Sequence, residues 1–266
     1  MIKLKLAAAA VATVMVATPV LAANWTGTAD YGVEAVGPFN TYDFSSAGAL
    51  LIDPTSQTTA NGYYQSFVTQ HLLNGVEVAN PLLKGIPPSY EITVVANFTS
   101  QLLPGTPNST TYQVTGGSFS LWLDKTPDHN FGGDSGFSGT ADGSVKILEG
   151  TVASGGGSNY IFGGQQFGGG ALQLQVTSYD HAIYNPNTIG GGDSIFTLRL
   201  NAPVDAPFLG PITSVQGNSY APLTGDLLYA ADGNLILTAV PEPESYAMLL
   251  AGLGLIGAIA RRRAAR

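Results

Sequence analysis

Acidic and amide side chains gather in one short stretch near the middle of the chain. Asp124, Asp128, Asn130 and Asp134 fall within eleven residues that also contain two glycines. Ca²⁺ binds several carboxylate and carbonyl oxygens, and a flexible loop is suited to bring such oxygens together. These four residues are therefore candidate ligands, although the twelfth position counted from Asp128 is a glycine, unlike an EF-hand. A solvated acidic loop is the alternative, and we expect no bound metal or cofactor.

Two serine motifs, Gly-Asp-Ser-Gly at 133–136 and Gly-Asp-Ser-Ile at 192–195, have residue types suited to nucleophilic catalysis. The first resembles the nucleophile segment of trypsin-like serine proteases, and the second resembles the serine block of GDSL hydrolases. A catalytic serine needs a histidine base and an orienting carboxylate. Phe137 stands where the protease pattern has a second glycine, and the second motif does not open the domain. Neither motif therefore predicts a hydrolase.

The remaining candidates for catalysis are scattered. His71, His129 and His181 fall on separate predicted elements, so their spacing does not indicate a zinc triad. No pair of carboxylates is marked by a surrounding motif for glycoside hydrolysis. The chain has no cysteine, which removes cysteine nucleophiles and thiolate metal sites. We therefore predict that the protein is not an enzyme.

The charge balance narrows the range of partners. Only 11% of the 266 residues are charged, against about 25% in an ordinary soluble domain. Ten basic and 18 acidic residues give a net charge of −8, and segment 24–239 alone has four basic and 16 acidic residues, a net charge of −12. A nucleic-acid surface needs clustered Lys and Arg. We therefore expect no nucleic-acid partner, whereas this balance favours solubility and association with cations.

The first 23 residues have the parts of a secretory signal peptide. Two lysines precede a largely apolar run at 6–20, and the segment ends in Ala22-Ala23. Small residues precede the cleavage site of such signals, so we place the cut after Ala22 or Ala23. Residues 1–23 are therefore predicted to form a signal helix that the secretion machinery and signal peptidase handle. A buried N-terminal helix is the alternative.

The last 27 residues, 240–266, have three parts in a fixed order. These are a proline-containing tetrapeptide, an apolar segment and a basic cluster: Val240-Pro241-Glu242-Pro243, residues 246–260, and Arg261, Arg262 and Arg263. Fifteen apolar residues in a helix span about 22 Å, less than the ~30 Å hydrocarbon core of a bilayer. Arginines beside a span stay in the cytoplasm by the positive-inside rule. We therefore predict a short transmembrane helix that serves as a temporary anchor, with the arginines as its cytoplasmic end.

This tripartite order closely resembles the C-terminal sorting signal of PEP-CTERM proteins. The resemblance implies a substrate of an exosortase, a membrane transpeptidase-like enzyme of Gram-negative bacteria that also make exopolysaccharide. The tail would be cut near Pro241, Glu242 and Pro243. Proline holds the backbone extended and lacks an amide donor, so the tetrapeptide can enter a protease cleft without joining the helix. A lasting C-terminal anchor with a proline-rich stalk is the alternative, and in both cases the body lies outside the cytoplasm.

Residues 24–239 are predicted to form one all-β domain. In 171–177, for example, Leu172, Leu174 and Val176 alternate with polar residues, which is typical of a strand with one buried face. Dipeptides such as Asn61-Gly62 and Asp232-Gly233 provide turn residues beside candidate strands. The best fit is an antiparallel β-sandwich of jelly-roll or immunoglobulin-like type.

Two segments of the body depart from this strand pattern. Residues 67–73 are the one stretch of the body that looks helical. The segment 150–170 contains nine glycines, and glycine weakens strands. We therefore expect flexible loops there, around a short edge strand near 160–162.

Three segments of the body, 61–73, 116–124 and 231–243, are together similar to the flocculation-associated group of PEP-CTERM proteins. This resemblance implies a non-enzymatic matrix component that helps cells to hold together with exopolysaccharide in flocs or biofilm. The leading hypothesis is therefore an exported protein, first anchored in the inner membrane. After exosortase processing it would have a structural or adhesive role at the outer surface or in the extracellular matrix.

A secreted carbohydrate-binding or carbohydrate-hydrolysing domain is the main alternative. Aromatic rings can stack on sugars, although aromatic residues on alternating strands more often belong to the core. The candidates are Trp122, Tyr63, Tyr64, Tyr179 and Tyr184. Unmarked carboxylates on a concave sheet would be needed for hydrolysis. A third option is a Ca²⁺-dependent adhesin that uses the loop 124–134.

Overall fold

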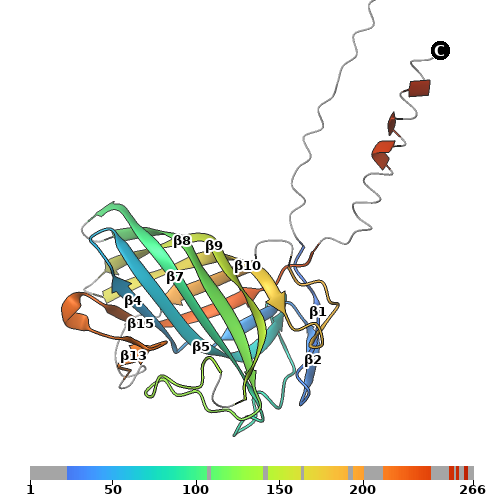
Figure 1. The fold of residues 1–266 in the computed structure, drawn as a ribbon, viewed down its shortest axis with the longest axis horizontal. Coiled ribbons are helices and arrows are strands. Elements are labelled where there is room, and N and C mark those ends of the chain that lie inside the picture. Colours follow the sequence, from blue (N-terminus) through green and yellow to red (C-terminus); the bar gives the residue numbers. More distant parts are fainter. Residues whose placement is uncertain are drawn as a thin grey trace, which may run out of the picture.

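The fold was obtained as a computed structural model (Figure 1). It describes residues 23–106, 109–139, 143–162, 165–190, 194–200, 212–240, 252–254, 256–257 and 261–262. The predicted signal peptide up to Ala22 lies outside the described residues. So do Pro241, Glu242 and Pro243 of the predicted sorting motif and Arg263 of the basic cluster.

Most of the described body is β-structure. The strands in chain order are β1 (Gly27–Asp30), β2 (Ala35–Phe39), β3 (Thr41–Phe44), β4 (Gly48–Pro54), β5 (Thr59–Leu73), β6 (Val76–Val78), β7 (Glu91–Thr106), β8 (Ser109–Asp124), β9 (Val145–Phe162), β10 (Gln165–Tyr179), β11 (Tyr184–Asn185), β12 (Ser194–Leu200), β13 (Ser214–Val215), β14 (Asn218–Ser219) and β15 (Leu227–Ile236). A short 3-10 helix, η1 (Pro222–Thr224), precedes β15. The prediction of an all-β domain is confirmed.

The main sheet closes on itself. β5, β7, β8, β9, β10 and β12 are successive antiparallel neighbours. β12 pairs with β15, and β15 pairs with both β3 and β4. β3 and β4 lie one after the other along the same position in the sheet, between β15 and β5, and each also pairs with β5. The result is a barrel of eight strand positions, called the closed sheet below.

The closed sheet replaces the expected jelly-roll or immunoglobulin-like sandwich. A sandwich of short strands buries its core between two stacked sheets. Here β5, β7, β8, β9 and β10 are each 15 to 18 residues long. Long strands that are tilted relative to the axis of the closed sheet allow the last strand to pair with the first. No strand edge of the sheet is then left unpaired. The sequence pattern is the same for both folds, because each strand has one buried and one exposed face.

The inner face of the closed sheet forms the main core. Along β10, Leu172 and Leu174 are buried inside, whereas Gln173 faces outward. This confirms the alternation predicted for 171–177. The inward side chains continue around the sheet through register partners, for instance Leu172 opposite Phe196 and Leu198 opposite Gly233. Alternation therefore identified the buried face correctly, although the partner of that face is the opposite wall of the same sheet.

The glycine-rich segment is part of two long strands rather than a loop. β9 and β10 pair along their length, from Phe162 opposite Gln165 to Leu148 opposite Tyr179. A Cβ atom at Gly157 would lie 2.5 Å from the Tyr112 hydroxyl oxygen. Glycine is therefore accommodated in these strands because a side chain from β8 occupies the space above it. The expectation of flexible loops at 150–170 is wrong for the residues that the structure describes.

Three further local expectations are also wrong. Residues 67–73, which look helical, belong to β5. Gly62, expected in a turn, lies within β5, where a Cβ atom would stand 2.3 Å from the Phe98 ring. Gly233, also expected in a turn, lies within β15, 2.8 Å from the Tyr64 hydroxyl when a Cβ is added. At these positions glycine makes room for a large neighbour.

The two ends of the closed sheet differ. At one end, β1, β2 and β11 form a separate three-stranded sheet, and Figure 1 shows β1 and β2 side by side there. Near them, Ala23 accepts a backbone hydrogen bond from Ala239. The β13–β14 hairpin lies against the outside of the closed sheet, where Val215 packs with Ala49, Leu51 and Ala230. The chain ends are therefore collected at the end that β1 and β2 cover.

The C-terminal tail is described only in part. Residues 252–254, 256–257, Arg261 and Arg262 have helical backbone, and the intervening residues lie outside the described ones. Among the described residues, no helix has the length and apolar character required to cross a membrane. The predicted transmembrane helix at 246–260 is therefore not found in the part of the chain that the structure describes.

Candidate functional site

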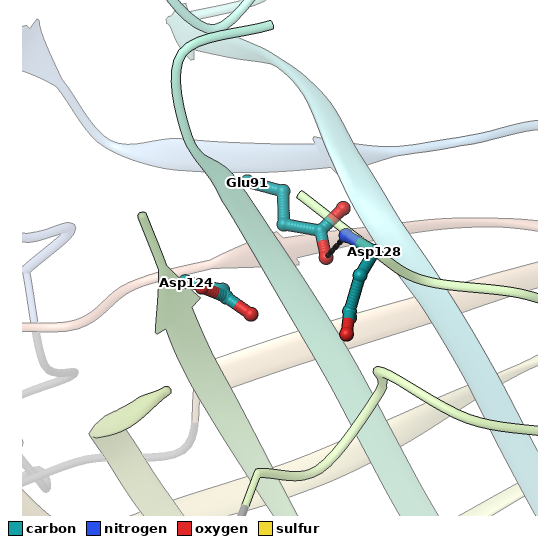
Figure 2. Close-up of side chains that lie close together, drawn as sticks. All are labelled: Glu91, Asp124 and Asp128. Carbon is teal, nitrogen blue, oxygen red and sulfur yellow. Dashed lines mark hydrogen bonds between the residues drawn. The ribbon is translucent and has the colours of Figure 1, made fainter. Parts of the chain in front are cut away.

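The structure brings two of the four candidate Ca²⁺ ligands together with a third carboxylate. Glu91 begins β7 and Asp124 ends β8, and the two residues are directly paired across these antiparallel strands. Asp128 lies in the loop that follows β8. Each carboxylate has an oxygen within 4.8 Å of the other two. Figure 2 shows the three side chains around one space, which we call the carboxylate cluster.

The carboxylate cluster also fixes the loop that it belongs to. Glu91 and Asp124 are each 3% exposed, whereas Asp128 is exposed. The Glu91 Oε1 atom accepts hydrogen bonds from the backbone amides of Asp128, at 3.0 Å, and His129, at 3.1 Å. Its Oε2 atom contacts His129 Nδ1. The His129 ring in turn stacks on Phe67, with ring centroids 4.1 Å apart. Glu91 therefore anchors the loop as well as contributing negative charge.

The chemistry of this cluster suits a hard cation. Ca²⁺ takes six to eight oxygen ligands, including carboxylates, backbone carbonyls and water. The three carboxylates would supply part of such a set, and solvent reaches the cluster through the exposed Asp128. Among the described residues, no other group of three acidic or histidine side chains meets in this way.

The other two predicted ligands have different roles. Asn130 Oδ1 accepts a hydrogen bond from the Gly133 amide within a tight turn. Asp134 accepts hydrogen bonds from the backbone amides of Gln216, at 2.9 Å, and Gly217, at 2.7 Å, and from the Gln65 side chain. Asp134 therefore ties the β13–β14 turn to the outside of the closed sheet. The structure therefore does not bring the four candidate ligands together at one place, because the chain turns between Asp128 and Asp134.

Glu91 was missed by the sequence analysis because it is 33 positions before Asp124. A signal for it was present in the hairpin pattern. A strand that begins with Glu91 and a returning strand that ends with Asp124 place these two residues opposite each other when the hairpin is aligned from its turn.

The candidate catalytic residues do not assemble in the described part of the chain. His129 contacts Glu91, His181 Nδ1 contacts Asn187, and His71 is buried in the core. Ser135 of the first serine motif forms a backbone bridge with Asn130. Gly192 and Asp193 of the second motif lie outside the described residues. The three histidines therefore do not form a zinc triad.

The proposed sugar-stacking residues are divided between core and surface. Tyr64 and Tyr184 are buried, so their faces are not available to a glycan. Trp122 is partly exposed, with the Lys146 ammonium 5.1 Å from its ring centroid. Tyr63 and Tyr179 are also partly exposed.

His71 belongs to a buried hydrogen-bonded chain of aromatic side chains. Asn80 Nδ2 lies 3.1 Å from His71 Nδ1, so the neutral ring carries its proton on Nε2 and donates it to the Tyr31 hydroxyl at 2.8 Å. The chain continues from Tyr31 to Tyr42, at 3.0 Å, and from Tyr42 to Tyr184, at 2.8 Å. Burial lowers the pKa of His71 to about 3. We call these five residues the tyrosine–histidine chain, and it fills the end of the closed sheet beneath β1 and β2.

The described ends of the body lie side by side. Ala239 donates a backbone hydrogen bond to Ala23 at 2.8 Å, and Asn24 forms a bridge with Thr238. Val240, the first residue of the predicted sorting motif, donates a backbone hydrogen bond to the Thr188 carbonyl at 2.8 Å. It is 43% exposed. Ala23, one of the two predicted signal-cleavage residues, therefore lies beside Ala239, which directly precedes the predicted sorting motif.

Residues 239–264 match the family model described as the PEP-CTERM protein-sorting motif. The chain carries a PEP-CTERM sorting signal. This PEP-CTERM protein is thus exported, is processed by an exosortase, and is associated with a membrane at least transiently. The match begins at Ala239, whose backbone amide donates to the Ala23 carbonyl. No curated protein and no solved structure matches the chain.

Proposed function

We propose that the mature domain of this PEP-CTERM protein is a non-catalytic component of the cell surface or extracellular matrix. Its role would be structural or adhesive, in flocs or biofilm that contain exopolysaccharide. The observation that carries the proposal is the position of the sorting signal. The match to the sorting motif begins at Ala239, and Ala239 and Val240 donate backbone hydrogen bonds to Ala23 and Thr188 of the folded body.

This position has a mechanical consequence for processing. The body is held together by a sheet that closes through β15, and the chain leaves that sheet directly before the sorting motif. Proline residues lack the amide hydrogen needed to extend the pairing. An exosortase could therefore cut near Pro241 without unfolding any strand, and a complete domain would be released or transferred. Such a product suits a building block of a matrix.

The surface charge supports a role in a hydrated matrix. The segment 24–239 has a net charge of −12 with four basic residues. Such a domain stays soluble through charge repulsion and gains cation-mediated contacts when divalent ions are present. Contact with an exopolysaccharide would then involve polar side chains and shared cations rather than a basic groove.

Processing is tested by intact-mass measurement of the protein recovered from the cell surface and from the medium. The wild type is expected to begin near Asn24 and to end near Val240. The double variant Pro241→Ala, Pro243→Ala is expected to retain Arg261, Arg262 and Arg263. Pro222→Ala, at an exposed position of η1, is the matched control and should be processed normally.

The adhesive role is tested in the same strains by a cell-aggregation assay. A deletion strain should aggregate less than its parent, and the wild-type gene should restore aggregation. The double proline variant should not restore it, because the unprocessed protein stays at the inner membrane. Normal aggregation of the deletion strain would contradict the adhesive role. Retention of the arginines in the wild-type protein would make the tail a lasting anchor.

A further inference from the structure

A cavity of about 210 Å³ lies inside the closed sheet, at the end opposite β1 and β2. Its wall is made by the inward faces of β4, β5, β7, β8, β9, β10, β12 and β15. Eight-stranded closed sheets are just wide enough either to be filled by side chains or to hold one small ligand. In this protein the aromatic residues fill one end, and the other end is left open.

The wall of the cavity is apolar and uncharged. Leu50, Ile52, Phe98, Leu172 and Leu198 are among its lining residues, and the described lining contains no Asp, Glu, Lys, Arg or His. Each of these side chains, apart from the partly buried Ile52, is nearly inaccessible to solvent. Empty apolar cavities of this kind stay dry and take up apolar molecules. A charged ligand would find no partner for its charge and would have to lose its hydration.

Glycines occupy inward positions of β9 and β10 beside the cavity. Register places Gly157 opposite both Gly170 and Tyr112, so all three face inward. A Cβ atom at Gly157 or Gly170 would lie 2.5 or 2.7 Å from the Tyr112 hydroxyl oxygen. Larger apolar side chains would fill the space and stabilise a purely structural core. Glycine in a strand interior lowers stability instead, and what it provides here is room for the Tyr112 side chain in the wall of the cavity.

Two polar groups in the wall are available for a ligand. Burial raises the pKa of the Tyr112 hydroxyl, which therefore stays protonated at neutral pH, and it makes no hydrogen bond within the described residues. Asn159 also lines the cavity, and its buried Oδ1 atom has no hydrogen-bond partner among the described residues. Pockets that bind small molecules combine an apolar wall with a few such polar groups, which orient the ligand. One donor and one acceptor match a ligand hydroxyl.

The size and the rim of the cavity define the ligand further. An engineered cavity of about 150 Å³ holds benzene, so about 210 Å³ corresponds to a single ring with a short substituent. Leu227, at the rim, is 40% exposed, and Pro54 beside it is exposed as well. These residues place the rim of the cavity at the surface of the domain.

From this geometry we propose that the closed sheet binds a small, uncharged, largely hydrocarbon molecule that carries one hydroxyl group and has about the size of a substituted single ring. The hydrocarbon part contacts Leu50, Phe98 and Leu198, and the hydroxyl group hydrogen-bonds with Tyr112 and Asn159. The proposal does not rest on an adhesive role, because the site is formed by the closed sheet itself. The domain would carry this ligand to the location to which the protein is sorted.

The test uses isothermal titration calorimetry on the exported protein purified from the producing cells. The probes are 4-ethylphenol, ethylbenzene, which lacks the hydroxyl, and benzoate, which carries a charge. The wild type is expected to bind 4-ethylphenol tightest, ethylbenzene about three- to tenfold more weakly, and benzoate at least tenfold more weakly than 4-ethylphenol. No binding of 4-ethylphenol, or equal binding of benzoate, would overturn the proposal.

Two variants assign the binding to the cavity. Tyr112→Phe keeps the ring and removes the hydroxyl, so it should weaken 4-ethylphenol binding about three- to tenfold and leave ethylbenzene within twofold. Ser100→Leu places a larger side chain in the cavity and should weaken both ligands at least tenfold. Gln101→Leu, on the exposed outer face of the same strand, is the matched control and should bind as the wild type does. Equal binding by Ser100→Leu and wild type would place the site elsewhere and overturn the proposal.

Discussion

The two ends of the closed sheet show how one strand architecture produces two different interiors. At the end beneath β1 and β2, Trp25, Phe39 and Tyr42 are fully buried and packed edge to face, with ring centroids 5.2 to 5.5 Å apart. At the other end, the inward faces of the closed sheet surround a cavity of about 210 Å³. The long strands cross both regions, so the difference comes from the side chains that face inward and from the separate sheet of β1, β2 and β11, which adds Phe39 and Tyr184 to the filled end. The aromatic end is suited to stability, and the open end is suited to binding.

The largest expected effect is loss of the aromatic packing. Trp25 contacts Phe39 and Tyr184, and its ring nitrogen donates to the Pro186 carbonyl at 2.9 Å. Trp25→Ala should lower the free energy of unfolding by about 3–5 kcal/mol, because it creates a cavity in a filled core. Leu227→Ala, at the rim of the open end, should cost less than about 1 kcal/mol. Urea unfolding followed by circular dichroism measures both, and equal losses would abolish the contrast between the ends.

The next effect is a pH dependence confined to the aromatic end. Burial lowers the pKa of His71 from 6.5 to about 3, so below pH 6.5 the unfolded chain binds a proton that the folded chain excludes. Stability is therefore fully present above pH 6.5 and is lost as the pH falls from 6.5 towards 3. The loss from this group is at most about 1.4 kcal/mol for each pH unit.

The matched variants for this pH dependence are His71→Gln and His181→Gln. His71→Gln should lower stability at pH 7.5, because it breaks the tyrosine–histidine chain, and should also flatten the pH profile between 6.5 and 4. His181 is exposed, so its variant should keep the profile of the wild type. Unfolding curves at several pH values measure this. A profile that stays equally steep without His71 would show that other groups cause it.

The sequence predicted those features of the fold that depend on the residue pattern within one strand. It did not predict features that depend on which strands pair with one another. Alternation in 171–177 correctly identified Leu172 and Leu174 as buried. Closure of the sheet depends on pairing of β15 with β12, β3 and β4, which no local pattern encodes. The glycines of 150–170 were interpreted as loops because their partner, Tyr112, is more than 30 positions away. The cavity was missed for the same reason.

The candidate site shows the same limit. Asp124 and Asp128 were found because they are close in sequence, and Glu91 was not, because it meets them only through the β7–β8 register. Asp134 is also close in sequence, yet it turns away to bind the amides of Gln216 and Gly217. The sorting signal was the feature most easily predicted from the sequence. Its three parts are contiguous, and their role does not depend on how the body folds.

A smaller effect is expected from overpacking the wall between the two ends. Gly62 on β5 lies beneath the Phe98 ring, and a Cβ atom there would stand 2.3 Å from that ring. Gly62→Ala should therefore lower the free energy of unfolding by about 1–3 kcal/mol. Gly75→Ala is an unsuitable control because of its positive φ, but Gly116→Ala is suitable, since nothing lies within 4 Å of a Cβ there. A Gly62→Ala protein as stable as Gly116→Ala would show that Phe98 can move into the cavity.

The smallest expected effect is stabilisation by Ca²⁺ at the carboxylate cluster, on the outer wall of the aromatic end. Extracellular Ca²⁺ sites commonly bind in the range of 10⁻⁴ to 10⁻³ M. At about 5 mM Ca²⁺, an affinity near 1 mM stabilises the native state by about 1 kcal/mol, since the ion binds only the folded chain. For a domain of this size that corresponds to a rise in Tm of about 2–4 °C.

Variants of two aspartates decide whether that rise comes from the cluster. Asp128→Asn removes an exposed carboxylate while its backbone amide still donates to Glu91, so the protein should fold and the rise in Tm should disappear. Asp53→Asn, on β4 towards the open end, should show the full rise. Equal shifts in both variants would mean that Ca²⁺ acts through the overall negative charge. A shift in Tm that is lost only in Asp128→Asn would place a cation at the aromatic end. That end would then combine a filled core with a charged outer face, and the opposite end would bind uncharged molecules.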